Sequence, residues 1–291
     1  MSKKIVILGG TGFIGKNLLD YFSRNTNLVL FKPTRAELNL LNSNEVFNYF
    51  EKIKPDFVVI AVIDIKSVEN SLIMFHNIYN SKNNIGLVVN LGSGAEYDKR
   101  VYLPNMKENY IGCSLPIDTY GMAKYIIGQE IEHDISEKFL NLRIFGIFGK
   151  HEDISRRFIS NNIIRALSGL SISINKDMYF DYIDVEDLAY FLHTYVFKTK
   201  LSNKTYNFCR GKSYSLMNIA KIIQQKINVD IHIKETGFNL EYSGNNSLLL
   251  SEIGNFDFKK IDTSIQDLID YYKHNLSSVE LENFRKLYSE Q

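Results

Sequence analysis

Three residues of the chain have the types and spacing of an acid–base centre. Tyr120 and Lys124 stand four positions apart in "YGMAK", so a helix would place both side chains on one face. A tyrosine phenol ordinarily titrates near pH ~10, and a neighbouring ammonium would lower that pKa. Ser93, in "NLGSGAEYD", could stabilise a glycine turn or supply a hydroxyl at a strand end. Together these residues predict a proton donor or acceptor that works near neutral pH.

A glycine-rich loop near the N-terminus predicts a dinucleotide site. In "ILGGTGFIG", Gly9, Gly12 and Gly15 lie between an apolar run and a helical pattern. Gly9 would allow a tight turn, Gly12 the close approach of a pyrophosphate, and Gly15 close packing of helix against strand. The helix N-terminus would then face the phosphates. We assign Phe13 and Ile14, within this loop, to the same cofactor site.

The end of the second expected strand bears on which cofactor binds. Lys32, Pro33, Thr34 and Arg35 follow that strand, and no acid occurs before Glu37. An Asp or Glu at this point binds a free ribose 2′-hydroxyl, whereas Arg accommodates a 2′-phosphate. We therefore expect NADP(H) in preference to NAD(H), with Lys32 and Arg35 as contacts. A solvated basic turn is the alternative, and one Arg is compatible with use of both cofactors.

The elements that would position these residues alternate between short apolar runs and helical patterns. This alternation predicts a parallel sheet covered on both faces, in a Rossmann-type doubly wound α/β fold. We expect strands at 4–8, 28–31, 56–62, 86–91, 140–145, 179–183 and 206–209, and helices at 14–22, 45–52, 71–79, 120–133, 156–167, 185–197 and 215–227. We expect a cofactor-binding domain over 1–149 plus about 181–210, and a smaller α/β substrate domain over about 150–180 and 211–291.

Composition narrows the class of protein. The chain has 291 residues, 45% of them apolar, and a net charge of +1, so nucleic acid and membrane surfaces are not expected partners. Cys113 and Cys209 lie far apart and the six histidines are scattered, so we expect neither a disulfide framework nor a metal site. No signal peptide or membrane-length apolar run is visible, and we expect a cytoplasmic protein.

Taken together, the motifs resemble the extended short-chain dehydrogenase/reductase superfamily, in its nucleotide-sugar epimerase/dehydratase branch. The resemblance rests on "GGTGFIG", "LGSGAEY", "YGMAK", "LRIFGIFGK" and "FDYIDVEDLA", and on "RAELNLLNSNEVFNYFEKIKPDFVVIAV". The R-x-E-L-x-L stretch is similar to that of GDP-L-fucose synthases and dTDP-4-dehydrorhamnose reductases. The resemblance implies that Ser93 bonds the substrate oxygen, Tyr120 donates the proton, and Lys124 tunes Tyr120 and holds the cofactor ribose. It also implies that Ala61 and Val62 line the dinucleotide, and that the protein is a homodimer.

The residues beside Ser93 depart from the family pattern. The resemblance implies that dehydratases carry Asp and Glu where this chain has Gly94 and Ala95, and that GDP-L-fucose synthase has a Cys at Ala95. Glu96 is shifted by one residue and should point elsewhere on an extended segment. The downstream His of that synthase falls near Ser160. We therefore expect an NADPH-dependent reductase of a 4-keto nucleotide sugar that does not epimerise its substrate.

The expected substrate site also differs from the family pattern. The family's phosphate-binding Arg is replaced by Phe180. One of Arg156 and Arg157 would take its place, because guanidinium suits phosphate, although a solvated basic turn is equally compatible with the sequence. The substrate-binding residues that we expect are Ser93, Gly94, Gly146, His151, Arg156 and Arg157.

Two other functions stay open at this point. A C4 epimerase of nucleotide sugars would retain a tightly held NAD(H) and need no added NADPH. A non-catalytic Rossmann protein that senses redox state or scaffolds a complex is the alternative from another class, and the joint presence of Ser93, Tyr120 and Lys124 argues against it. The resemblance further implies a role in making capsular polysaccharide or lipopolysaccharide sugars.

Overall fold

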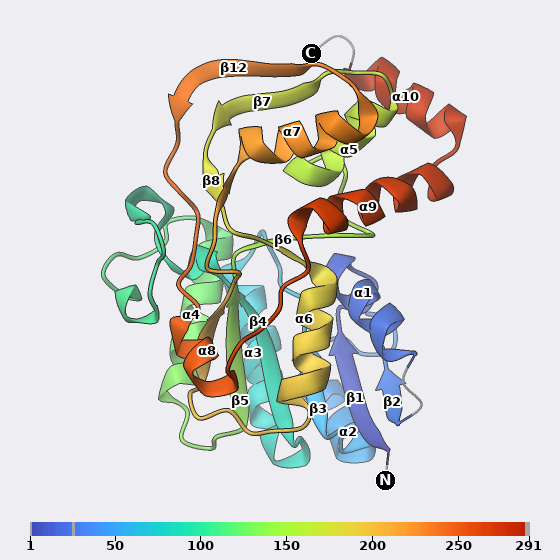
Figure 1. Ribbon diagram of the computed structural model, residues 1–291. Coiled ribbons are helices and arrows are strands. Elements are labelled where there is room, and N and C mark those ends of the chain that lie inside the picture. Colours follow the sequence, from blue (N-terminus) through green and yellow to red (C-terminus); the bar gives the residue numbers. More distant parts are fainter. Residues whose placement is uncertain (1, 25–26, 289–291) are drawn as a thin grey trace.

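The computed structural model describes residues 2–24 and 27–288. Figure 1 shows a lower unit built on one large sheet and an upper unit built from later parts of the chain. The sheet has six strands in the order β10-β5-β4-β3-β1-β2, and each pair is parallel. This confirms the predicted Rossmann-type fold. The strands are β1 (Lys3–Leu8), β2 (Leu28–Phe31), β3 (Phe57–Ile60), β4 (Leu87–Ser93), β5 (Phe139–Ile144) and β10 (Thr205–Phe208).

Helices cover both faces of this sheet, which explains why its strands are apolar on both sides. In β1, Ile5 and Ile7 belong to one buried cluster, whereas Val6 and Leu8 belong to another. The first cluster lies under α1 and α6, and the second lies under α2, α3 and α4. These helices are α1 (Phe13–Phe22), α2 (Ser43–Ile53), α3 (Val68–Asn80), α4 (Thr119–His133) and α6 (Val185–Phe191), which a π-helical turn (Leu192–Val196) extends.

The upper unit has its own core around a two-stranded parallel sheet of β7 and β12. Ile163, Ile174, Ile223 and Ile265 are fully buried in it. Its elements are α5 (Phe158–Leu167), β7 (Ile172–Asp177), α7 (Leu216–Ile227), β12 (Ile231–Phe238), α9 (Ile261–Asn275) and α10 (Ser278–Tyr288). The sequence pattern did not predict β7, and after residue 227 it predicted a mixed tail of strand, loop and helix without bounds for β12; the residues of both strands are partly polar and exposed.

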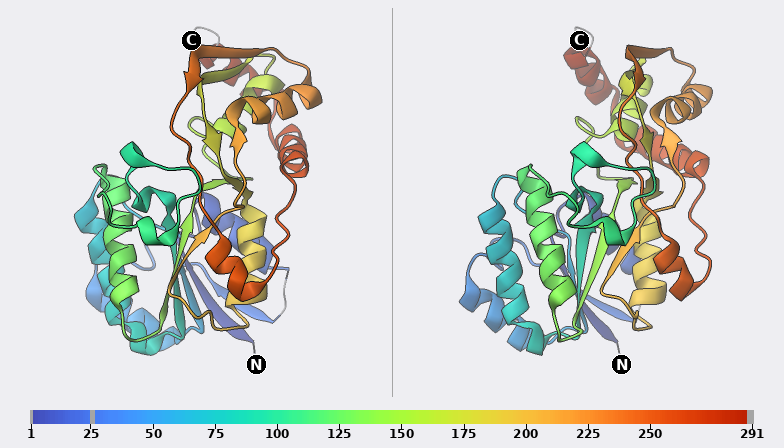
Figure 2. Two further views of the ribbon diagram at one scale, coloured as in Figure 1. Left: turned by 60° about the vertical axis from the view of Figure 1, so that its left-hand side comes forward. Right: turned by 90° about the vertical axis from the view of Figure 1, so that its left-hand side faces the viewer.

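Short strand pairs connect the two units. The strand expected at 179–183 is divided into β8 and β9, which have different partners. After β12 the chain descends past the loop that follows β4, where Met106 N donates to Ser243 O at 3.0 Å. Figure 2 shows these two segments side by side before the chain reaches α8. The connecting elements are β6 (Gly146–Phe148), β8 (Tyr179–Phe180), β9 (Tyr182–Asp184), β11 (Tyr214–Ser215) and α8 (Ser247–Ile253).

The descending segment packs on the large sheet. Leu249 and Phe256 belong to the same buried cluster as Ile5 and Ile7, although both lie in the range that we assigned to the substrate domain. The domain boundaries therefore stay a prediction. No helix in the described ranges has the length and apolar character needed to span a membrane.

Candidate active site

The structure brings Ser93 and Tyr120 together at the carboxyl end of the central strand. Ser93 is the last residue of β4, and its hydroxyl accepts from Ala95 N at 3.1 Å, at the start of the short 3₁₀ helix η2 (Gly94–Glu96). Tyr120 lies in the first turn of α4, which Asp118 caps by accepting from Gly121 N at 2.9 Å. The Ser93 hydroxyl lies close enough to the phenol of Tyr120 to lower its pKa. Two hydroxyl groups therefore converge on one point at the edge of the sheet.

Lys124 lies one helical turn further along α4 and is only 5% exposed. Its Nζ donates to Leu91 O at 2.5 Å and lies 6.0 Å from the centre of the Tyr120 ring. Burial lowers the pKa of Lys124 to about 8, and the Glu96 carboxylate acts in the opposite direction. The ammonium is thus buried one helical turn from Tyr120, and its charge is sensitive to pH in the alkaline range.

The pKa of Tyr120 is raised, which differs from our expectation that Lys124 would lower it. Burial has the largest effect, whereas the Ser93 hydroxyl and the charge of Arg157 lower the pKa by less. The physical reason is that the Lys124 ammonium is directed at the Leu91 carbonyl and is itself desolvated. Tyr120 is therefore held as a protonated phenol, the form that donates a proton to a substrate oxygen.

A buried ion pair between Glu96 and Arg143 holds the backbone of Ser93 in place. Glu96 is fully buried, and its Oε2 accepts from Arg143 Nε at 2.6 Å. Its Oε1 accepts from Ser93 N at 3.1 Å, and Asn141 Nδ2 donates to both carboxylate oxygens at 3.2 Å. The side chain of Glu96 therefore points beneath the end of the sheet, as expected, and fixes the backbone of Ser93.

The cofactor loop has the geometry that its glycines require. Gly9 has a φ of +85°, and a Cβ built on it would lie 2.7 Å from Ala61 O. A Cβ on Gly15 would lie 2.2 Å from Gly9 O, so the loop and the first turn of α1 are in backbone contact. Gly12 is the N-cap of α1 and has no side chain to bond the first helical amides. The free N-terminus of α1 suits a phosphate, as predicted from the loop.

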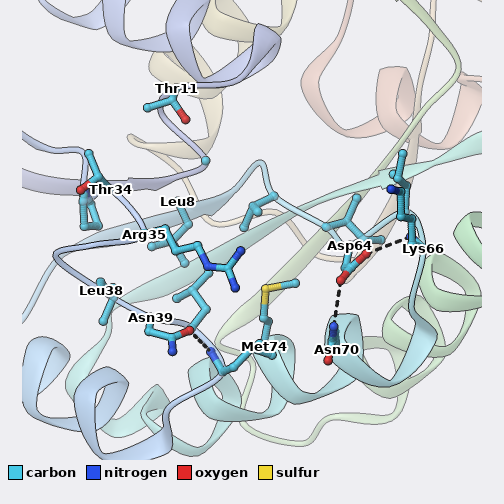
Figure 3. Close-up of a pocket in the computed structure, with 17 residues that line it drawn as sticks. Leu8, Thr11, Thr34, Arg35, Leu38, Asn39, Asp64, Lys66, Asn70 and Met74 are labelled. Carbon is cyan, nitrogen blue, oxygen red and sulfur yellow. Dashed lines mark hydrogen bonds between the residues drawn. The ribbon is translucent and has the colours of Figure 1, made fainter.

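A cavity of about 430 Å³ opens beside this loop, at the carboxyl ends of β1, β2 and β3. Figure 3 shows Arg35 extending across it toward Met74. Asp64 accepts from Lys66 N and from Asn70 Nδ2, both at 2.9 Å, along the opposite wall. The residues that line the cavity are Leu8, Gly9, Thr11, Pro33, Thr34, Arg35, Leu38, Asn39, Leu40, Leu41, Val62, Ile63, Asp64, Ile65, Lys66, Asn70 and Met74.

The size, position and basic side chains of the cavity fit the adenosine half of a dinucleotide. Of the residues predicted to bind the cofactor, Gly9, Arg35 and Val62 line it, and Ala61 contacts Gly9. Lys32 is not in the lining, and its Cβ lies beside Gly10. Phe13 and Ile14 begin α1, where Ile14 packs against the core. Across residues 2–24 and 27–288, the structure contains no group of three His, Cys, Asp or Glu side chains that could hold a metal ion.

The second large hollow is a groove of about 960 Å³ in the upper unit. Both predicted arginines border it. Arg156 is 75% exposed and lies 3.7 Å from Asp153, whereas Arg157 caps α5 and lies 3.9 Å from the buried carboxylate of Glu152. Arg157 borders the groove, and its charge also lowers the pKa of the Tyr120 phenol.

Three other residues considered in the sequence have structural partners. His151 lies between Asp20, at 3.1 Å, and the Tyr271 hydroxyl, at 3.3 Å. Gly146 begins β6, and its N donates to Asp181 O at 2.9 Å. Neither residue borders the groove. Ser160 is fully buried and donates to Glu152 Oε2 at 2.5 Å, so it does not face Tyr120.

Several residues of the two sites had no assignment from the sequence. Asn39 lies in the R-x-E-L-x-L stretch, which could have indicated it. Asp64 and Lys66 follow β3 directly, at the sheet edge where a cofactor binds, and this position is a usable signal. Tyr242 comes from the descending segment and places its hydroxyl beside Gly94 and Ser93, and no local sequence pattern indicates it.

The comparisons with known proteins agree with this geometry. A GDP-6-deoxy-D-talose 4-dehydrogenase of Aggregatibacter actinomycetemcomitans is 25% identical over 94% of this chain and 98% of the relative. A GDP-L-fucose synthetase of Naegleria fowleri superposes with a TM-score of 0.82 at 15% identity, covering 94% of this chain and 93% of that one. A GDP-mannoheptose C4 reductase of Campylobacter jejuni with NADP bound gives 0.75 at 21% identity, covering 94% and 98%. Residues 5–209 match the model of the NAD dependent epimerase/dehydratase family, and the chain therefore belongs to this family of NAD(P)-dependent enzymes.

Proposed function

We propose that this protein is an NADPH-dependent reductase of the C4 ketone of a nucleotide-linked sugar, and that it does not epimerise its substrate. The observation that carries the proposal is the meeting of Ser93 with a protonated Tyr120 beside Lys124. The two residues that follow Ser93, Gly94 and Ala95, have no titratable side chain.

The three side chains act on one carbonyl group. The hydroxyls of Ser93 and Tyr120 hydrogen-bond the ketone oxygen and orient the carbonyl carbon. The cofactor, when bound, supplies the hydride and is oxidised as the ketone is reduced. Tyr120 transfers its proton to the oxygen as negative charge develops there, so the product is an alcohol. The ammonium of Lys124 stabilises the phenolate that remains on Tyr120.

Epimerisation at C3 or C5 would require a base that removes a proton from a carbon next to the ketone. Gly94 and Ala95 cannot act as that base, and the nearest carboxylate, Glu96, is paired with Arg143 below the sheet. Its carboxylate is also held by Ser93 N and Asn141 Nδ2. These contacts support a site that transfers one hydride and one proton only.

The basic side chains that line the groove support the proposal that the substrate carries a diphosphate. Arg157, Lys176 on β7 and Lys234 on β12 line the walls of the groove, and the charge of Arg157 also acts on Tyr120. The relative from Aggregatibacter is a 4-dehydrogenase of a GDP sugar, and oxidation of a C4 alcohol is the reverse of reducing a C4 ketone. The Campylobacter neighbour is a C4 reductase of a GDP sugar. We extend both features, GDP and reaction at C4, to the substrate of this chain.

The preference for NADPH rests on Arg35. Its guanidinium lies in the cavity beside the glycine loop, with Lys66 as a second cation in the lining. Guanidinium binds phosphate through parallel hydrogen bonds, which suits a ribose 2′-phosphate. Glu37, the first acid after β2, accepts from Thr34 N at 2.8 Å and does not line the cavity.

The test is turnover of a panel of 4-keto sugars linked to GDP, dTDP, CDP and UDP, each with NADPH or NADH. We expect one GDP-linked 4-keto sugar to oxidise NADPH in equal amounts and to give one C4 alcohol by NMR. In deuterated water, the enzyme should add no deuterium at C3 or C5 beyond the rate without enzyme. Interconversion of C4 alcohols without added cofactor would instead establish an epimerase.

A further inference from the structure

Gly94, next to Ser93, has no side chain. The hydroxyl of Tyr242, a residue far along the chain, lies where a side chain at position 94 would be. A Cβ built on Gly94 would lie 2.7 Å from the hydroxyl oxygen of Tyr242. Tyr242 belongs to the segment that descends from β12, and this segment runs beside the loop after β4 in both views of Figure 2. The side chains of Ser93, Tyr102 and Tyr120 all influence the pKa of Tyr242, so its phenol lies beside them. A third hydroxyl group is therefore present at the acid–base centre.

The position of Tyr242 is fixed by both backbone and ring. Its N donates to Tyr179 O at 2.8 Å, and its O accepts from Asp181 N at 3.0 Å. Its ring centre lies 5.0 Å from that of Tyr102 and 5.1 Å from that of Phe145. These contacts hold the phenol edge toward Ser93 without help from a ligand.

Tyr102 holds the same phenol from the other side. Its hydroxyl donates to Gly94 O at 2.9 Å and contacts the Tyr242 hydroxyl. Burial has the largest effect on the pKa of Tyr242 and raises it, so this phenol stays protonated near neutral pH. Tyr242 can therefore donate or accept a hydrogen bond, but it cannot serve as a base.

The substrate limits what this third hydroxyl group can contact. A pyranose with a ketone at C4 has C3 and C5 as neighbours, and C5 carries the ring oxygen and C6. The only hydroxyl next to the ketone is on C3. Ser93 and Tyr120 engage the ketone oxygen, and Tyr242 lies beside Ser93 on the side of Gly94.

We infer that Tyr242 is a substrate-positioning residue whose hydroxyl bonds the C3 hydroxyl of the 4-keto sugar, in the space left by Gly94. This inference rests on the proposed function and specifies which sugars the site selects. It also explains why position 94 must stay small, since any side chain there would displace the Tyr242 hydroxyl or the Phe145 ring, 2.7 Å from the built Cβ.

The test compares Tyr242→Phe with wild type on two substrates, a GDP-linked 4-keto-6-deoxy sugar with a C3 hydroxyl and its 3-deoxy analogue. We expect kcat/KM to fall roughly tenfold or more on the C3-hydroxy sugar, the size of one lost hydrogen bond at a desolvated site. The same variant should stay within about threefold of wild type on the analogue, which has no hydroxyl to lose. A structural defect would lower both values equally.

The matched control is Tyr179→Phe, on the same part of the chain, whose ring is 41% exposed and does not contact Ser93. It should behave as wild type on both sugars, and the NADPH affinity of Tyr242→Phe should be unchanged. If Tyr242→Phe loses kcat/KM equally on both sugars, or on neither, the inference is overturned. Turnover by the wild-type enzyme would in that case still support the proposed function. If wild type reduces neither sugar with NADPH, the proposed function fails and the inference fails with it.

Discussion

The cofactor side and the substrate side of this molecule are built in different ways. The cavity beside the glycine loop is lined by residues that lie between Leu8 and Met74, in consecutive β–α units. The groove of the upper unit is lined by segments between Ser155 and Tyr288 that come from several elements. Its connection to the chemistry is also non-local, because Tyr242 meets Ser93 only after the chain returns from β12.

The difference shows where specificity can change in this fold. The cofactor side depends on close backbone approach, as between Gly9 and Ala61, which tolerates little substitution. The substrate side depends on side chains, and here aromatic residues such as Phe180 and Tyr242 pack together, with ring centres 5.0 Å apart. A new sugar can be accommodated by changing these side chains while the backbone that holds the cofactor stays the same.

The largest effect on kcat should come from substitution of Tyr120, the residue that the cofactor side and the substrate side share. Tyr120→Phe removes the proton donor while keeping the ring, and kcat should fall roughly 10²- to 10⁴-fold. NADPH binding, measured by fluorescence titration, should be unchanged. Tyr125→Phe, on the same helix, is the matched control and should retain near wild-type kcat. Turnover of Tyr120→Phe within a few-fold of wild type would show that another group donates the proton.

A smaller effect is expected on the cofactor side. Arg35→Ala should raise the KM for NADPH roughly 10- to 100-fold and leave the KM for NADH nearly unchanged, because only NADPH carries the 2′-phosphate. Lys32→Ala tests the alternative from the sequence and should change either KM by less than about twofold, since Lys32 does not line the cavity. If Lys32→Ala has the larger effect, the turn after β2 rearranges when the cofactor binds.

On the substrate side, replacing each of the two adjacent arginines should change the substrate KM by a different amount. Arg157→Ala should raise the substrate KM about tenfold, since this side chain borders the groove and its charge also acts on Tyr120. Arg156→Ala should have less than about a twofold effect, because its side chain is 75% exposed and pairs with Asp153. Steady-state kinetics at saturating NADPH measures both. Unchanged KM in both variants would remove these arginines from the diphosphate contact.

The smallest expected effect is the dependence of kcat on pH. The pKa of Lys124 is lowered to about 8, so its ammonium loses the proton as pH rises through that value. The neutral amine no longer stabilises the phenolate of Tyr120, and kcat should fall to about half near pH 8 and continue to fall above it. The measurement is kcat between pH 6 and 10 with NADPH saturating. A flat profile to pH 9 would mean that bound cofactor restores the ordinary pKa of Lys124.

The features that could be predicted from the sequence are those that depend on residues a few positions apart. The sheet, the glycine loop and the pairing of Tyr120 with Lys124 follow from periodicity and from residues a few positions apart. The direction of the Tyr120 pKa did not follow, because it depends on burial and on the hydrogen bond from Lys124 to Leu91, which are tertiary features.

The upper unit was predicted less completely for a related reason. The strands β7 and β12 alternate weakly, and most of β12 is exposed, so neither has the continuous apolar pattern of β3. Tyr242 stands in "NLEYSGNN", a polar stretch without periodicity. Its role depends on a bridge to Phe180 and on ring contacts that form only in the folded chain.

The carboxylate beneath Ser93 has a consequence for the dynamics of the site. The Ser93 amide donates to Glu96, which is fully buried and paired with Arg143, so this amide can exchange with deuterated solvent only when the end of β4 opens. The loop that follows has exposed apolar side chains, including Val101 at 50% and Ile117 at 72%, and should exchange much sooner. We therefore expect slow exchange at the amide of Ser93 and faster exchange in the exposed parts of the loop that follows.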